Sequence, residues 1–202
     1  CCIMCGKVSK LDLCRKCEIK LNKKIIFEDN ININNMYFDE HIYLFKYEEI
    51  IRKLILNYKF NEKDYIYKIF IQILKNNKKI YCKMKKYDII IPVPVSNKRL
   101  KTRGFNQSAL IGRNIADFLD VEYNENVLFK IRNNNTQSSL NREERERNVK
   151  GVYSIKGQLI IKNKEILLID DIYTTGNTVN ECSKILKENG AKRIGIFTVA
   201  KD

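Results

Sequence analysis

The stretch Ile166-Leu-Leu-Ile-Asp170-Asp171-Ile-Tyr-Thr174-Thr175-Gly176-Asn177-Thr178-Val179 determines how the rest of the chain is interpreted. Its four leading apolar residues predict a buried strand, and an amphipathic helical pattern begins after the glycine. Between strand and helix lie two adjacent acids and a short run of hydroxyl, glycine and amide side chains. This order places unpaired backbone N–H groups and the positive end of a helix dipole at the loop. The stretch therefore predicts an anion-binding loop, to which Thr174, Thr175 and Thr178 add hydroxyl donors.

The two acids suggest which anion the loop binds. Asp170 and Asp171 are expected about a sugar's width from the loop, where carboxylates accept hydrogen bonds from vicinal hydroxyls. Gly176 lets the chain approach a ligand closely, so a ribose 5-phosphate fits the combination. The alternative is an ordinary strand–loop–helix in which Asp and Thr side chains cap the helix. Neither Gly-x-Gly-x-x-Gly nor Gly-Lys-Thr is present, which disfavours a dinucleotide or P-loop site.

This segment closely resembles the signature of type I phosphoribosyltransferases, which bind phosphoribosyl pyrophosphate (PRPP). The resemblance implies that Asp170 and Asp171 hold the ribose hydroxyls. It implies further that the 5-phosphate is held by the loop residues Thr174, Thr175, Gly176, Asn177 and Thr178, and that Mg²⁺ binds together with PRPP.

Length and charge bound the remaining possibilities. The 202 residues suit one domain with an appendage. The formal net charge of +14, from 38 basic and 24 acidic residues, indicates a polyanionic partner such as nucleic acid, a phosphorylated substrate or an anionic membrane face. The alternative is that AT-biased codons enriched a solvated surface in lysine. No apolar run reaches the ~18 residues of a membrane span and no signal peptide is visible, so the cytoplasm is expected.

Four of the seven cysteines form two close pairs, Cys2-x-x-Cys5 and Cys14-x-x-Cys17. Each pair can hold one metal ion from one side, and Gly6 permits the sharp turn between the pairs. Four thiolates in a closed shell suit structural zinc. Disulfides are the weaker alternative in a reducing cytosol, and iron or a redox pair are further alternatives.

The other cysteines are expected to play no part in this site. Cys1 adjoins the first pair, but its spacing to Cys5 is wrong for a tight knuckle. Cys82 and Cys182 are predicted to be small core residues, and Cys182 shares a helical face with Val179 and Leu186.

The domain organisation follows from the order of patterns. Residues 1–24 predict a four-cysteine zinc knuckle with a basic linker, and residues 25–202 predict the main domain. Strands are expected at residues 41–47, 89–91, 126–132, 149–155, 166–169 and 193–199, with helical patterns between several of them. This alternation predicts an α/β fold with a mostly parallel sheet and helices on both faces. Ligands bind beyond the carboxyl ends of such strands, where both the Pro92 and the Asp170 loops are expected.

Two further segments narrow the family. The strand end Ile91-Pro-Val-Pro94 leads into Lys98-Arg99-Leu-Lys-Thr-Arg103-Gly104-Phe105-Asn106-Gln107. Residues 98–103 of this segment are predicted as a basic loop, which ends at Gly104 before a helix over residues 105–119. Later comes Gln137-Ser-Ser-Leu140-Asn-Arg142-Glu-Glu-Arg145-Glu-Arg147-Asn148-Val149-Lys-Gly151-Val-Tyr153. With the knuckle, they resemble the ComF family, the competence-associated phosphoribosyltransferase-like proteins that include those called ComFC and GntX. The resemblance covers essentially the whole chain, although the family often has Thr where this chain has Asn134.

The resemblance implies an accessory factor in natural transformation, and two hypotheses follow. In the first, the chain is a PRPP- and Mg²⁺-dependent transferase with an unknown acceptor. The loop from Val93 to Ser96 would face the pyrophosphate, and residues 133–147 would close as a lid. Candidates to contact pyrophosphate are Arg99, Arg103, Arg132, Arg142, Arg145 and Arg147. The alternative for the last four is a salt-bridged helix face with Glu143, Glu144 and Glu146.

In the second hypothesis, the chain handles incoming single-stranded DNA and keeps the PRPP site for a ligand signal or as a relic. Lysines and arginines would follow the phosphates, and the knuckle would dock DNA or a helicase partner. We favour a combination of the two, a PRPP-type site within a competence protein at the inner face of the membrane near a DNA-uptake channel.

Overall fold

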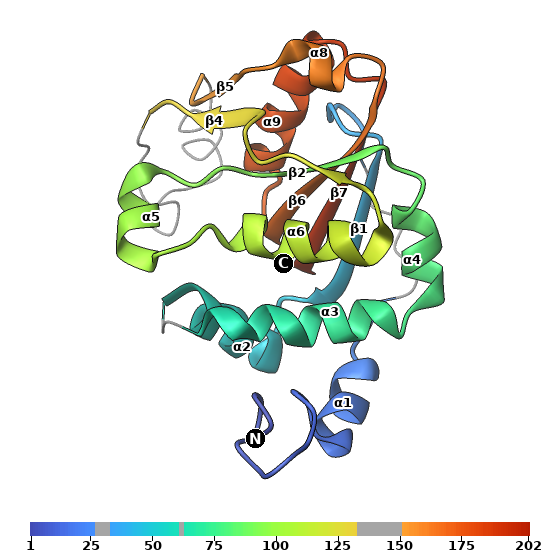
Figure 1. Cartoon of the computed structure of the whole chain (residues 1–202), viewed down its shortest axis with the longest axis vertical. Helices are drawn as coiled ribbons and strands as arrows, with labels where there is room; N and C mark the ends of the chain where they lie inside the picture. The colour runs from blue at the N-terminus through green and yellow to red at the C-terminus, as the bar shows by residue number, and fades with distance from the viewer. Residues whose placement is uncertain (27–32, 61–62, 133–150) are drawn as a thin grey trace.

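The computed structural model describes residues 1–26, 33–60, 63–132 and 151–202. Helices and strands alternate through most of this part of the chain (Figure 1). In order they are α1 (Arg15–Asn22), β1 (Glu40–Lys46), α2 (Glu49–Phe60), the 3₁₀ turn η1 (Asp64–Ile66), α3 (Tyr67–Lys75), α4 (Lys78–Met84), β2 (Ile89–Pro92), α5 (Asn97–Arg103), α6 (Gln107–Leu119), β3 (Glu122–Tyr123), β4 (Leu128–Lys130), β5 (Tyr153–Ile155), α8 (Gln158–Ile161), β6 (Glu165–Tyr173), α9 (Asn177–Glu188) and β7 (Arg193–Lys201).

A five-stranded sheet with the order β1-β7-β6-β2-β3 forms the centre, and its neighbouring strands all run parallel. Strands of such a sheet are covered on both faces, so they read as continuous apolar runs. The four apolar residues at 166–169 are fully buried in β6, as this rule requires. The predicted mostly parallel sheet is confirmed.

Helices cover both faces of this sheet, which confirms the second part of the predicted fold class. In Figure 1, α6 lies against one face, with α2 and α3 beyond it and the N-terminal segment outermost, whereas α9 lies on the other side with β4 and β5. Two apolar clusters correspond to these layers: Leu167 and Ile169 belong to the cluster with α2, α3 and α6, and Ile166 and Leu168 to the cluster with α9. Alternate residues of β6 therefore serve opposite faces.

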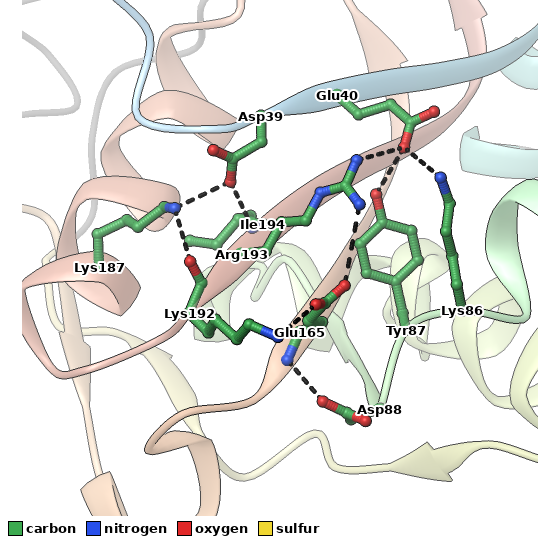
Figure 2. A network of polar contacts seen from close by, with 10 residues as sticks. All are labelled: Asp39, Glu40, Lys86, Tyr87, Asp88, Glu165, Lys187, Lys192, Arg193 and Ile194. Carbon is green, nitrogen blue, oxygen red and sulfur yellow. Dashed lines mark hydrogen bonds and ion pairs between the residues drawn. The ribbon is translucent and has the colours of Figure 1, made fainter.

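A polar network lies at the amino-terminal ends of the strands of the sheet (Figure 2). The Glu40 carboxylate accepts a hydrogen bond from the Tyr87 hydroxyl (2.9 Å) and lies 3.4 Å from the Arg193 guanidinium and 3.6 Å from the Lys86 ammonium. Tyr87 is buried, and a Cβ at Gly195 would overlap its ring and hydroxyl. A glycine in β7 thus permits the close approach that joins these groups.

Some local predictions were wrong. The segment containing Arg99 and Arg103, predicted as a loop, forms α5: the Ser96 hydroxyl accepts from the Arg99 N–H (3.3 Å) and Gly104 ends the helix with φ +79°. The expected strand at 126–132 shrinks to β4, which pairs antiparallel with β5 outside the main sheet. The edge of the main sheet is taken instead by β3, which pairs with β2.

Cys82 and Cys182, the two cysteines outside the N-terminal segment, differ in their burial. Cys182 is buried in α9 as predicted, but Cys82 is exposed on α4. The prediction for Cys82 was wrong because α4 turns Ile80 and Met84 into the core, and Cys82 lies on the opposite side of that short helix. Across the described residues, no helix combines the length and apolar character that crossing a bilayer would require.

Candidate functional site

The acids lie inside β6 rather than after it. Asp170 pairs in register with Thr198 of β7, and Ile172 pairs with Ala200, so the strand continues to Tyr173. The expectation that the strand ends before the acids is corrected by this pairing, because β7 continues beside it and supplies backbone partners. Both carboxylates therefore project from a rigid central strand near its carboxyl end.

The loop after β6 presents an uncapped helix terminus. Gly176 adopts φ +77° and precedes the first residue of α9, and no side chain caps this helix. A Cβ at Gly176 would overlap the Tyr173 ring, so only glycine fits the turn. The alternative in which Asp and Thr side chains cap the helix does not describe this terminus. Backbone N–H groups of the first turn thus face the loop, as anion binding requires.

The twin carboxylates have different partners. One oxygen of Asp170, Oδ1, accepts hydrogen bonds from the Ser108 hydroxyl (3.0 Å) and from the backbone N–H of Asp171 (2.9 Å). Asp171 Oδ1 lies 2.9 Å from the Lys59 ammonium, and these two side chains are only 11% and 18% exposed. Lys59 thus compensates one of the two negative charges.

Burial governs the protonation of this region. Burial first, and then the neighbouring Asp171 charge, raises the pKa of Asp170 to about 7, against the opposing effects of the Lys59 charge and the two hydrogen bonds. Burial also lowers the pKa of Arg103, which the Asp171 charge counteracts. Burial first, and then the Arg99 charge, lowers the pKa of Lys130 to about 8. Cationic groups of α2, α5 and β4 therefore interact electrostatically with the carboxylates.

A hollow of about 190 Å³ lies in front of these groups. Its lining comprises Tyr47, Lys59 and residues 170–179, which include both acids and the whole predicted phosphate loop. Thr174 is exposed, and Thr175, Asn177 and Thr178 are partly exposed. The structure therefore brings together all seven residues that were predicted to bind PRPP.

A larger cavity of about 660 Å³ lies nearby, between the loop after β2, α5, α6 and the β4–β5 sheet. Asn106 lines this cavity, and its side chain donates to the Val93 carbonyl (3.1 Å). The same side chain accepts from the Ser108 N–H (3.0 Å), and the Ser108 hydroxyl reaches Asp170. The larger cavity and the acid pair are therefore connected through two residues of one helix start.

The structure describes three of the six arginines that were predicted to contact pyrophosphate. Arg99 and Arg103 lie on α5, where the Arg103 guanidinium stacks 4.7 Å from the centre of the Phe60 ring. Arg132 is exposed after β4. Arg142, Arg145 and Arg147, and the whole predicted lid of residues 133–147, lie outside the described residues.

Sequence reasoning missed three residues of the hollow and its supports: Lys59, Tyr47 and Ser108. Ser108 directly follows the Arg-Gly-Phe-Asn-Gln segment, so its position was a usable signal. Lys59 has no comparable signal, because it is one of 38 basic residues and approaches Asp171 from a distant part of the chain.

The cysteine pairs form a second candidate site. The Sγ atoms of Cys2, Cys5, Cys14 and Cys17 all lie within 4.8 Å of one another, and those of Cys5 and Cys14 are 3.8 Å apart. A tetrahedron with zinc–sulfur bonds of about 2.3 Å separates its sulfurs by about 3.8 Å. The four clustered cysteines can therefore hold a metal ion. Cys1 is exposed and stands outside the cluster.

Metal content tests this cluster. We expect about one metal ion per chain, zinc by its donor set, and Cys5→Ser should reduce the bound metal and lower the melting temperature. Elemental analysis and thermal unfolding measure both effects. Cys82→Ser, which removes an exposed thiol outside the cluster, is the matched control. A native chain purified without metal and unchanged by added zinc would contradict the assignment.

The raised pKa of Asp170 predicts a pH effect on folding. An unfolded Asp titrates near 3.9, so the folded chain binds more protons than the unfolded chain between about pH 4 and 7, and stability from this group falls as the pH rises. Asp170→Asn removes that loss, and its stability relative to the native chain should increase by about 2–3 kcal/mol from pH 5 to pH 8. Urea unfolding at both pH values measures the change. Asp117→Asn, at an exposed position of α6, should show no such trend.

Comparison with known proteins agrees with this geometry. Residues 106–202 match a family model described as a phosphoribosyl transferase domain, a range that contains β6, the loop and α9. The chain is 31% identical over 198 residues to competence protein ComFC of Streptococcus pneumoniae, covering 98% of this chain and 80% of that protein. Competence protein F of Haemophilus influenzae is 29% identical over 171 residues, covering 81% and 73% of the two chains. DNA utilization protein YhgH of Salmonella typhi is 31% identical over 114 residues, covering 56% and 49%.

The match to ComFC extends over nearly the whole chain. The matched transferase domain contains both acids and the loop that follows them. The chain therefore belongs to the ComF family of competence proteins.

Proposed function

We propose that this chain is a ComF-type competence protein that binds PRPP at the β6–α9 loop and handles incoming single-stranded DNA during natural transformation. The observation that carries the PRPP part is the juxtaposition of two carboxylates with an uncapped helix terminus in one hollow. The names of the relatives, which refer to competence and DNA utilization, support the DNA part. We place the protein in the cytoplasm, at the inner face of the membrane near a DNA-uptake channel, with a helicase or another uptake protein as partner.

In this proposal, different groups of the hollow bind different parts of the ligand. Backbone N–H groups at the start of α9 and the hydroxyls of Thr174 and Thr175 bind the 5-phosphate. Asp170 and Asp171 accept hydrogen bonds from the ribose hydroxyls. The hollow of about 190 Å³ is below the roughly 300–1,000 Å³ of most small-molecule pockets, so it suits a sugar phosphate better than a whole nucleotide. The pyrophosphate would lie at the border of the hollow and extend beyond it.

Mg²⁺ fits this site as a partner of the ligand. Lys59 already pairs with Asp171, so the acids leave few free oxygens for a cation, and the metal would be held chiefly by pyrophosphate and ribose oxygens. When bound, it would neutralise charge on the pyrophosphate. The protein groups described above bind and orient the sugar.

The alternative is an active phosphoribosyltransferase of base or nucleotide metabolism with no direct role in DNA handling. The cavity of about 660 Å³ beside Asn106 favours it, because it offers room for an acceptor near the acids. The acceptor's lone pair would form a bond to C1 of the ribose while pyrophosphate leaves with the C1–O electrons, and the acceptor's proton would pass to pyrophosphate or solvent. Positioning and charge would supply most of the catalysis.

Calorimetry with PRPP and Mg²⁺ tests the site. The native chain should bind, and Asp170→Ala/Asp171→Ala should weaken binding by about 10–100-fold, because the ribose loses its acceptors. Asp117→Ala, on the exposed face of α6, is the control for a lost acid. Absence of binding heat with the native chain would remove the PRPP proposal. A subsequent screen of bases as acceptors would distinguish a binding protein from an active transferase.

A salt titration tests DNA handling. The net charge of +14 predicts that affinity for single-stranded DNA falls steeply with salt, with a logarithmic slope of about −0.7 per phosphate contact. Most of the aromatic residues interleaved with lysine are core residues: Tyr43, Phe45 and Tyr58 are buried, whereas Phe60 is 62% exposed. Charge should therefore dominate over base stacking. An uncharged peptide nucleic acid of the same sequence should not bind, and native affinity no better than that of a neutral protein would exclude this role.

A further inference from the structure

Lys59 is a cation of the hollow that the family's signature loop does not contain. It lies one residue before the end of α2, and its ammonium is 2.9 Å from Asp171 Oδ1. An ammonium has three N–H donors, and the ion pair uses one of them. Because Lys59 also lines the hollow, its remaining donors are available to a ligand there.

The position of Lys59 is fixed by its neighbour. Tyr58 is fully buried, and its hydroxyl donates to the Gln107 carbonyl at the start of α6 (2.9 Å). The Tyr58 ring also packs against Phe105, with ring centres 5.4 Å apart. The end of α2 is thus held against the same helix start that supplies Ser108 to Asp170. These contacts hold the backbone at Lys59 in place, which lowers the entropic cost of using its side chain in binding.

Lys59 and the phosphate loop lie on opposite sides of the acids. α2 belongs to the layer with α6, whereas α9 covers the other face of the sheet, and both acids project from β6 between them. Arg103, stacked on Phe60 beside Lys59, interacts electrostatically with Asp171 from the same side. A sugar phosphate anchored at α9 with its ribose on the acids therefore directs its C1 substituent toward α2 and α5.

We propose that Lys59 binds the pyrophosphate of the ligand while it holds Asp171 ready for the ribose. This inference rests on the proposed PRPP site and extends it to a residue outside the signature loop. Two adjacent carboxylates would repel a ligand that carries several negative charges, and a fixed cation between acid and ligand offsets that repulsion. Lys59 bridges the two, with one donor on the carboxylate and another on a pyrophosphate oxygen.

Two ligands that differ only at C1 separate this role from a structural one. Calorimetry would compare PRPP with ribose 5-phosphate, both with Mg²⁺, for the native chain, Lys59→Met and Lys59→Arg. Lys59→Met should weaken PRPP binding by about 10–100-fold, the size of a lost charge-assisted hydrogen bond, and ribose 5-phosphate binding by less than about threefold. Lys59→Arg should restore most of the affinity for PRPP. Lys53→Met removes an exposed lysine from the same helix and should leave both affinities unchanged.

Each other outcome has a defined meaning. Equal weakening of both ligands by Lys59→Met would show that Lys59 only positions Asp171, and no weakening would show that it does not act in binding; either result overturns the inference. Thermal unfolding identifies a misfolded Lys59→Met variant, in which case Lys59→Gln and the Lys59→Arg comparison decide the question by the same ratio of affinities. Failure of the native chain to bind either ligand would instead overturn the proposed function together with this inference.

Discussion

Two carboxylates can lie side by side at the end of a buried strand only if their charge is compensated. Asp170 and Asp171 meet this condition in different ways. Asp170 is hydrogen-bonded by Ser108 and a backbone N–H, and its pKa is raised toward neutrality, chiefly by burial. Asp171 forms a close ion pair with Lys59. Adjacent like charges repel strongly in a poorly solvated site. The acid pair therefore depends on the Lys59 ammonium of α2 and the Ser108 hydroxyl of α6.

The parallel sheet places the acid pair and the Glu40 network at opposite ends of its strands. At the amino-terminal edge, Glu40 joins Arg193, Lys86 and Tyr87 in a network with both signs of charge (Figure 2). At the carboxyl ends of the strands, the acids, an uncapped helix and the Lys59 ammonium face one hollow. In a parallel sheet all the amino-terminal ends of the strands lie together, and so do all the carboxyl-terminal ends. Polar groups can therefore pair with one another at the amino-terminal ends, while those at the carboxyl-terminal ends keep donors and acceptors for a ligand.

Features encoded in short segments were predictable from the sequence. The strand, acids, glycine and helix of residues 166–179 are contiguous, and the two Cys-x-x-Cys pairs have a spacing that itself implies a cluster. Contacts between distant segments were not predictable. Lys59 reaches Asp171 across more than half of the chain, and nothing in its local sequence distinguishes it from the other lysines. The predicted placement of the acids after the strand failed for the same reason, since pairing with β7 extends β6.

Short elements were the other source of error. α5 is dense in charge, with no residue buried, so apolar periodicity gives no signal there, although its Ser96 cap and Gly104 end were visible. β4 and β5 have three residues each, too few to reveal whether they join the main sheet. Cys82 was misplaced because α4 was not recognised as a helix, and the side that a residue faces depends on the phase of its helix.

Helix α2 links the two candidate sites and gives both a common structural basis. Ile50 and Leu54 line a groove shared with the clustered cysteines, and Leu54 is part of the same apolar cluster as Cys2 and Cys17. At the other end of the helix, Lys59 reaches Asp171. The helix is rigid and only twelve residues long, so a shift at the cysteine end must be absorbed by packing or carried to the hollow. Close-packed interiors resist small displacements. A knuckle fixed by four metal–thiolate bonds would therefore also fix the position of α2, and with it the Lys59 ammonium that pairs with Asp171.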